Sequence, residues 1–188
     1  GTAGFVRLEA TVVDRDGKPV RKPWLENRIS RCYFGPIKRA PFFTDELMND
    51  IDYYPEAYLD RLAHEGVNGL WLTVTFADLA KTDYFPVSPT RERRLAKLRR
   101  TVDKCLKYGI KTWIFCIEPR RLEAGDPLLA KFPPEALSEA PWGMGKVLCP
   151  ASPLVRQYLE EAFRDLFEQV PGLPGVINIS QGEQPTTW

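Results

Sequence analysis

Residues 109–117 read Gly-Ile-Lys-Thr-Trp-Ile-Phe-Cys-Ile, a glycine followed by an apolar run of the length of one β-strand. The same arrangement occurs twice more, where Gly66 precedes residues 67–74 and where Gly172 precedes residues 175–180. An amphipathic pattern comes before each glycine, which is typical of a helix that ends at that glycine. Because strands that alternate with helices pair in parallel, the sequence predicts an α/β fold.

Three helices are predicted, over residues 55–66, 90–109 and 153–172, from their apolar spacing and from the residues at their ends. Each has a proline at or just before its first position and a glycine at its end. The residues expected to face inward are Tyr58, Leu59, Leu62 and Ala63, then Leu95, Leu98, Val102, Cys105 and Leu106, and finally Val155, Tyr158, Leu159, Ala162, Phe163, Leu166 and Val170.

A further strand is predicted at residues 28–34, which brings the total to four parallel strands with flanking helices. A complete eight-stranded (βα)8 barrel typically uses about 250 residues, so this chain is too short to hold one. We therefore expect residues 28–188 to form the amino-terminal half of a TIM barrel. Residues 118–149 are rich in proline and too long for a simple strand-to-helix turn, so we expect a loop layer over a site.

The first 27 residues differ from the rest of the chain. Residues 5–13 alternate apolar and polar side chains, and residues 14–17 read Asp-Arg-Asp-Gly, which is typical of a turn. We expect residues 1–27 to form a β-hairpin that covers the bottom of the barrel or to be the tail of a preceding β domain.

The composition is that of an ordinary globular domain, with 44% hydrophobic and 27% charged residues. The net charge of +1 offers no general attraction to nucleic acid or to an acidic membrane, and the apolar runs are far shorter than the roughly 20 residues of a membrane-spanning helix. A basic cluster at residues 91–107 is expected to be a solvated helix face rather than a nucleic-acid site. The sequence leaves periplasmic, secreted and cytoplasmic locations open.

The four cysteines are far apart and form no metal-binding pair, so we expect buried free thiols. His64 is the single histidine, which argues against a zinc site or a histidine-based catalytic triad. We expect no metal and no cofactor.

Four segments resemble the barrel domain of hexosaminidase-type glycoside hydrolases and their bacterial relatives. They are residues 31–39, residues 66–71, residues 108–111 and residues 148–153, and the resemblance as a whole spans about residues 28–185. It implies a carbohydrate-processing catalytic domain whose substrate is a glycoside.

The strand at residues 175–180 is followed by Gly182-Glu183-Gln184-Pro185, and loops beyond the carboxyl ends of parallel strands are where barrel enzymes place their chemistry. In the family, the fourth strand ends in a glutamate that protonates the glycosidic oxygen and later deprotonates water, so the resemblance implies that Glu183 is the general acid/base. Sugar alkoxides leave poorly, so such an acid needs a pKa raised toward neutrality. The family has an aspartate just before this glutamate, whereas this chain has Gly182, so acetamido-assisted cleavage is not implied.

Five further residues are candidates for substrate binding. Arg39 lies where the family has an arginine that binds sugar hydroxyls, and Glu118 ends its strand, where it could bind a hydroxyl or pair with a neighbouring arginine. Tyr84, Trp142 and Trp188 are expected in loops at the mouth, where flat aromatic faces stack on pyranose rings.

Trp71 and Trp113 lie inside predicted strands and are expected in the core. Two other functions stay open: a non-catalytic carbohydrate-binding or scaffold module, and a half-barrel that self-associates through its open sheet edges.

Overall fold

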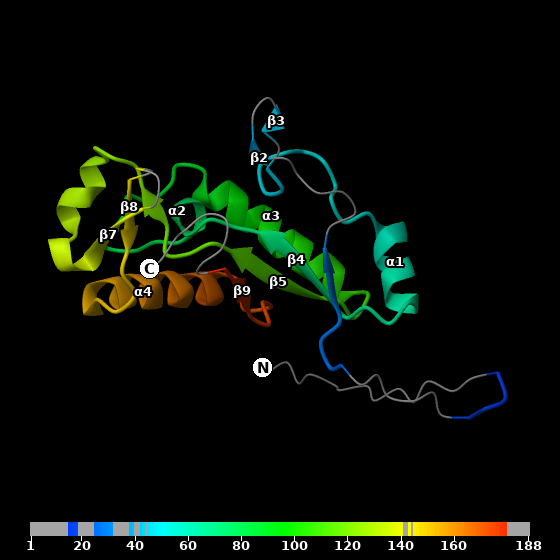
Figure 1. Ribbon diagram of the computed structural model, residues 1–188. Helices are drawn as coiled ribbons and strands as arrows, with labels where there is room; N and C mark the ends of the chain where they lie inside the picture. The colour runs from blue at the N-terminus through cyan, green and yellow to red at the C-terminus, as the bar shows by residue number, and fades with distance from the viewer. Residues whose placement is uncertain are drawn as a thin grey trace, which may run out of the picture.

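A computed structural model describes residues 15–18, 25–31, 38–39, 42–43, 45–140, 143 and 145–179, with only the backbone described at 38–39 and 42–43. The main sheet has four parallel strands: β1 (Ile29–Arg31), β4 (Gly69–Thr73), β5 (Lys111–Cys116) and β9 (Val176–Asn178). Their order across the sheet is β1-β4-β5-β9, so each strand lies beside the next one in the chain (Figure 1). The predicted α/β fold with a four-stranded parallel sheet is confirmed, whereas the described strands do not close a barrel.

The three predicted helices are α1 (Glu56–His64), α3 (Arg91–Leu106) and α4 (Pro153–Gln169), and a short helix α2 (Phe76–Leu79) follows β4. Gly66 and Gly109 have φ angles of 80° and 69°, which allow the chain to turn sharply after α1 and α3. Gly172 is needed for a different reason, since a Cβ there would lie 2.6 Å from Cγ1 of Val102.

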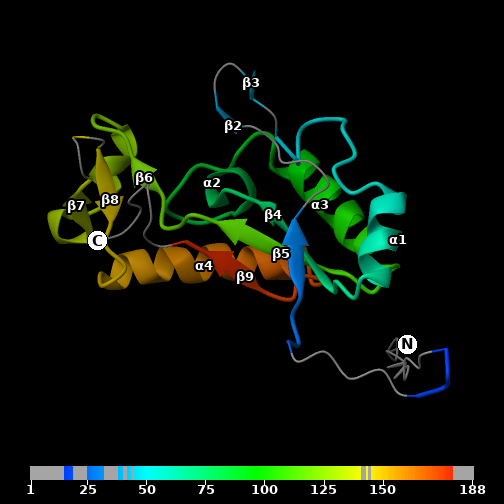
Figure 2. The same ribbon diagram turned by 45° about the vertical axis from the view of Figure 1, so that its right-hand side comes forward.

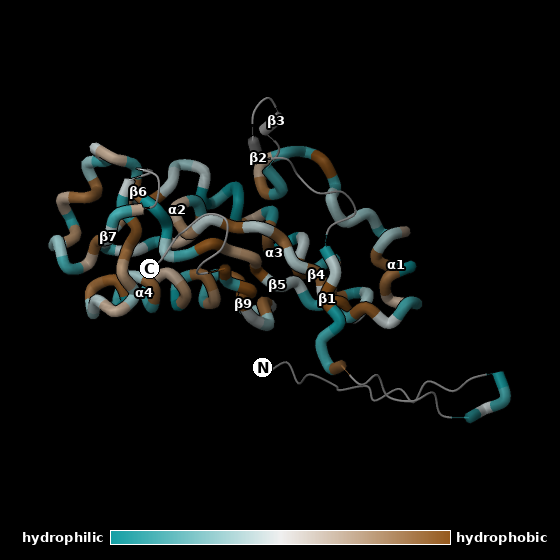
Figure 3. Tube along the Cα trace, viewed as in Figure 1, coloured by the Kyte–Doolittle hydropathy of each residue, from teal (hydrophilic) through white to brown (hydrophobic). Residues whose placement is uncertain are grey.

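The inward stripes of the helices are buried or half-buried as predicted, with one exception. Leu106 is 44% exposed, because it is the last residue of α3 and no further turn follows to pack beside it. Figure 3 shows polar and apolar residues alternating along α4, as expected of a helix that buries one side.

All three long helices lie on the same face of the sheet. The strands follow chain order, and right-handed crossovers between neighbouring parallel strands place each helix on the same side. Helices α3 and α4 lie side by side, since Arg99 donates hydrogen bonds to the backbone and side chain of Gln169 at 2.8 and 2.7 Å. Figure 2 shows α4 behind β9.

The other face of the sheet carries large side chains that no helix of the described chain covers. Trp71 pairs with Trp113 in register, and Phe115 pairs with Ile177, so these four residues share this face and are half-buried. We call them the open-face cluster. The prediction that Trp71 and Trp113 lie in the core was wrong, because the helices bury the alternate residues of each strand instead, such as Leu72.

Residues 118–149 form a small antiparallel sheet rather than the predicted loop layer. Its strands are β6 (Arg121–Leu122), β7 (Leu137–Glu139) and β8 (Lys146–Leu148), in the order β6-β8-β7, with 3-10 helices η1 (Pro127–Lys131) and η2 (Pro134–Ala136) between β6 and β7. Strands of two or three residues are too short to leave a periodic pattern in a sequence. The small sheet lies beyond the carboxyl end of β5 (Figures 1 and 2).

The region between β1 and α1 holds a short antiparallel pair, β2 (Lys38–Arg39) and β3 (Phe42–Phe43), followed by a segment at residues 45–54 that packs along α3. Arg94 binds Asp45 at 2.7 Å, and Lys104 binds Asp52 at 2.6 Å. The basic face of α3 was predicted to be solvated. This prediction was wrong for Arg94 and Lys104, because each of them binds an aspartate that lies 49 or 52 positions earlier in the chain.

In the amino-terminal part, residues 15–17 of the turn predicted at residues 14–17 are described and do turn, with Gly17 at a φ of 75°. The expected hairpin strands on either side fall outside the described residues. In the described part of the chain, no helix combines the length and the apolar character needed to cross a membrane.

Candidate functional site at the carboxyl ends of the strands

The carboxyl ends of β4, β5 and β9 meet at one edge of the sheet, because all three strands are parallel neighbours. In α/β folds this edge is where ligands bind and where catalytic residues are placed. The side chains that follow these three strands therefore define the candidate site.

Glu118 follows β5 by two residues and is 1% exposed. Its Oε1 accepts a hydrogen bond of 2.9 Å from the backbone N–H of Phe76, the first residue of α2. The hydroxyl of Tyr158, on α4, lies 3.4 Å from its Oε2, a long contact for a hydroxyl donor. The carboxyl therefore joins the start of α2 to the middle of α4.

The backbone of Glu118 is bound as well. Its N–H donates to Oδ1 of Asn178 at 3.0 Å, and its carbonyl accepts from Nδ2 of Asn178 at 3.0 Å. Asn178 is the last residue of β9, and its Oδ1 also accepts from the thiol of Cys116 at 3.4 Å. We call these five residues, Phe76, Cys116, Glu118, Tyr158 and Asn178, the Glu118 junction.

Burial controls the electrostatics of the junction. It raises the pKa of Glu118 to about 7, against the opposing effects of the Phe76 hydrogen bond and the positive charge of Arg120. Burial, followed by the charge of Glu118, also raises the pKa of Cys116 to about 12 and raises the pKa of Tyr158 well above its usual range. Among the titratable members of the junction, Glu118 is thus the one whose pKa lies near neutral pH.

The carboxyl of Glu118 makes its contacts to the protein itself, and at 1% exposure it is closed to a ligand in this conformation. The substrate role predicted for it stays a prediction. Arg120 attracts the carboxylate, as in the alternative in which Glu118 pairs with a neighbouring arginine.

The other predicted site residues are only partly described. Glu183, Trp142 and Trp188 lie outside the described residues, and Arg39 is described only as a backbone position in β2. Tyr84 lies in the connection from α2 to α3 and is half-buried, with its ring centroid 6.1 Å from that of Phe132 and 6.0 Å from that of Tyr158.

Tyr158 is therefore the neighbour that Tyr84 and Glu118 have in common, and these are the two predicted residues that the structure brings close together. Sequence reasoning missed Tyr158 and Asn178. Tyr158 belongs to the inward stripe of α4 and was therefore assigned to the core. Asn178 is a polar residue near the carboxyl end of a predicted strand, and the same position drew attention to Glu118 and Glu183. The sequence could therefore have indicated Asn178 as a candidate site residue.

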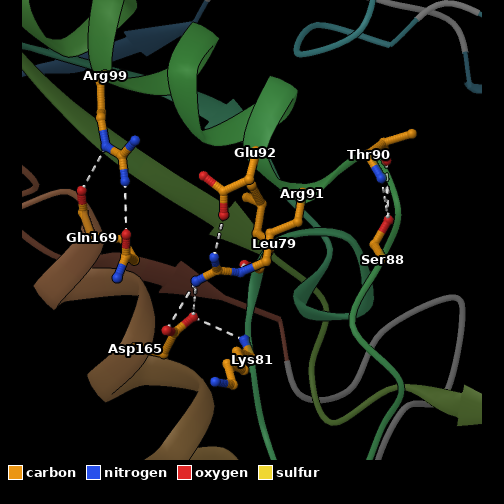
Figure 4. Close-up of polar contacts among 9 residues, drawn as sticks. All are labelled: Leu79, Lys81, Ser88, Thr90, Arg91, Glu92, Arg99, Asp165 and Gln169. Atoms are coloured by element: carbon orange, nitrogen blue, oxygen red, sulfur yellow. Dashed lines mark hydrogen bonds and ion pairs between the residues drawn. The ribbon is translucent and has the colours of Figure 1, made fainter.

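A hollow of about 330 Å³ lies on the outer surface between α4 and the connection from α2 to α3. Its lining is of mixed charge and includes Lys81, Asp83, Glu161 and Asp165. The backbone N–H of Lys81 binds Asp165 at 2.8 Å (Figure 4). The backbone N–H of Asp83 binds Glu161 at 3.1 Å, so these two carboxylates hold the connection onto α4. Within the described ranges, no group of three or more histidine, cysteine or acidic side chains is arranged to hold a metal ion.

In comparisons with known proteins, no family model matches the chain, and no match is found among curated proteins. The resemblance to hexosaminidase-type glycoside hydrolases stays a prediction from the sequence.

Proposed function

We propose that this chain is part of a catalytic domain that hydrolyses a glycosidic bond, with Glu183 as general acid/base. One observation carries the proposal: the four parallel strands follow chain order with their helices on one face, which is the arrangement of a (βα) barrel. Glu183 follows Asn178, the last residue of β9, by five positions in the sequence, and barrel enzymes place catalytic groups beyond the carboxyl ends of their strands.

The chemistry suits a carboxyl in such a loop. A glutamic acid beside the scissile bond gives its proton to the departing oxygen and then, as a carboxylate, takes a proton from the attacking water. In this proposal Arg39 binds sugar hydroxyls, and Tyr84, Trp142 and Trp188 supply aromatic faces for the sugar rings.

The test is hydrolysis of a panel of aryl glycosides by the wild-type protein and by Glu183→Gln. We expect the variant to lose at least about 100-fold in kcat, since general acid/base catalysis contributes about 10² to 10⁴. The loss should be smaller for aryl groups that leave without protonation. The matched control is Glu123→Gln, whose carboxylate is on the small sheet and 71% exposed, and which should keep wild-type turnover.

Turnover that survives Glu183→Gln in a folded protein would remove Glu183 from the mechanism. Binding of oligosaccharides in calorimetry, with no hydrolysis of any glycoside in the panel, would favour the non-catalytic carbohydrate-binding module instead.

The open-face cluster favours a second candidate, self-association. Trp71, Trp113, Phe115 and Ile177 are only partly buried, on a sheet face that no described helix covers. Burial of such surface is favourable by about 25 cal/mol per Å², so an assembly that covers it gains stability. Sedimentation velocity tests this candidate: a dimer supports it, and a stable monomer at high concentration excludes it.

A further inference from the structure

The Glu118 junction closes the edge of the sheet where the strands end. Its hydrogen bonds join residues 40, 42 and 60 positions from Glu118 along the chain, on α4, α2 and β9. The carboxyl of Glu118 thus holds α2 and α4, and the backbone of the same residue holds β9.

The charged and titratable groups that face this carboxyl are few. They are Cys116 at the end of β5, Arg120 in the segment that follows it and Tyr158 on α4, and α2 contributes a backbone N–H. Cys116 and Tyr158 are neutral over the physiological range, because burial raises the pKa of both. Arg120 is therefore the cation that compensates a charge on Glu118.

The compensation by Arg120 is partial. Its Nη2 lies 3.8 Å from a carboxylate oxygen of Asp126, and its guanidinium lies 4.9 Å above the ring of Phe85. A negative charge on Glu118 shares Arg120 with Asp126, and its other partners are the backbone N–H groups of Phe76 and Arg120 and the long Tyr158 contact. A buried charge with so few partners is costly, and an arrangement that lets water reach it becomes more favourable.

We propose that the Glu118 junction is a pH-operated latch: it stays closed while the Glu118 carboxyl is neutral, and charging that carboxyl favours a locally open form in which α2 and α4 release it to water. The latch includes Asn178, the last residue of β9, which precedes Glu183 by five positions in the sequence. The inference goes beyond the proposed function and does not depend on glycosidase activity.

The size of the effect follows from proton linkage. The pKa of Glu118 is about 7 in the closed form and about 4.5 when the carboxyl is in water. Such a shift raises the ratio of open to closed molecules by about 300-fold in total as the pH rises through this interval. The closed form therefore dominates most strongly in acid, and its advantage falls as the pH approaches and passes 7.

Amide hydrogen exchange of the 188-residue chain, followed by NMR between pH 5 and pH 8, tests the latch. The Phe76 amide reports on it directly, because that N–H donates to Oε1 of Glu118. After correction for the intrinsic exchange rate, we expect its protection to fall by about 50- to 100-fold over this range. The Ile114 amide, which donates to the Gly175 carbonyl at 3.3 Å in the main sheet, should change much less.

Glu118→Gln mimics the neutral acid and should abolish the pH dependence at Phe76, whereas Glu123→Gln should keep it. Tyr158→Phe removes a hydrogen bond that lowers the pKa of Glu118, so it should move the transition to higher pH, and it provides a second test if Glu118→Gln does not fold. Protection at Phe76 that is independent of pH would overturn the proposal. So would protection that falls in parallel at Phe76 and Ile114, because the opening would then be global unfolding.

Discussion

Replacing Arg91 with methionine should destabilise the protein far more than the loss of an ordinary surface arginine. Arg91 is the first residue of α3, and its side chain is only 10% exposed. Its Nη2 binds both carboxylate oxygens of Asp165 at 2.9 and 2.8 Å, and its Nε donates to the Leu79 carbonyl at 2.9 Å (Figure 4). One guanidinium thus ties α4 and the end of α2 to α3.

Removing one partner of a buried ion pair costs about 3–5 kcal/mol, because the other charge is left buried. The Asp165 side chain is 17% exposed and keeps the Lys81 N–H at 2.8 Å, which places the expected loss at the lower end, about 3 kcal/mol. Methionine keeps the apolar stem of arginine, so lost packing contributes little. Arg91→Lys should restore only part of the stability, because one ammonium nitrogen cannot replace the three guanidinium nitrogens that bind Asp165, the Leu79 carbonyl and Glu92.

The assay is urea denaturation followed by tryptophan fluorescence. Arg121→Met is the matched control, because Arg121 pairs with Glu123, which is 71% exposed, and exposed pairs contribute at most about 1 kcal/mol. A double-mutant cycle with Asp165→Asn should give a coupling of about 2 kcal/mol. If Arg91→Met loses no more stability than Arg121→Met, the pair does not hold α3 and α4 together and the reasoning fails.

Three further predictions concern stability. Because folding raises the pKa of Glu118 from 4.5 to about 7, the folded state holds a proton that the unfolded state releases, and the stability of the wild type falls as the pH rises through this interval. In urea denaturation, the stability of Glu118→Gln relative to the wild type should therefore rise by about 3 kcal/mol between pH 4 and pH 8. Parallel curves of stability against pH for the two proteins would contradict this. Gly175→Ala should cost about 1–3 kcal/mol in thermal unfolding, because its Cβ would lie 2.6 Å from Cζ3 of Trp113, and Trp113→Leu in the same chain should recover part of the loss. Lys104→Ala breaks a partly exposed ion pair with Asp52 and should cost less than about 1 kcal/mol of stability. This loss should become smaller at high salt, because salt screens exposed charges, and a loss that salt does not change would contradict an electrostatic role for the pair.

The parallel sheet and the three long helices could be predicted because their signals are local. Apolar spacing within α1, α3 and α4 marks the buried faces, and a glycine with positive φ ends α1 and α3. The elements that escaped prediction are short. Helix α2 has four residues and the strands of the small sheet have two or three, so their formation depends on contacts with distant segments rather than on a repeating pattern.

The two errors about exposure have a common cause. Trp71 and Trp113 lie on strands as predicted, but on the sheet face that the helices leave uncovered. The hand and direction of the crossovers decide which face the helices cover, and a single strand's sequence does not contain this information. Similarly, nothing local to α3 indicates that Asp45 and Asp52 cover its basic side chains. Burial of a side chain depends on all the segments around it, whereas a local pattern reports only on one.

The order of strands and helices, their parallel pairing and the absence of a strong net charge follow from the amino-acid residues read in a line, because period and turn chemistry act over a few neighbouring positions. The properties of Glu118 do not. Its burial, its hydrogen bonds to α2 and α4 and its raised pKa arise from residues 40 to 60 positions away, and a carboxyl acquires such properties only when folding removes it from water.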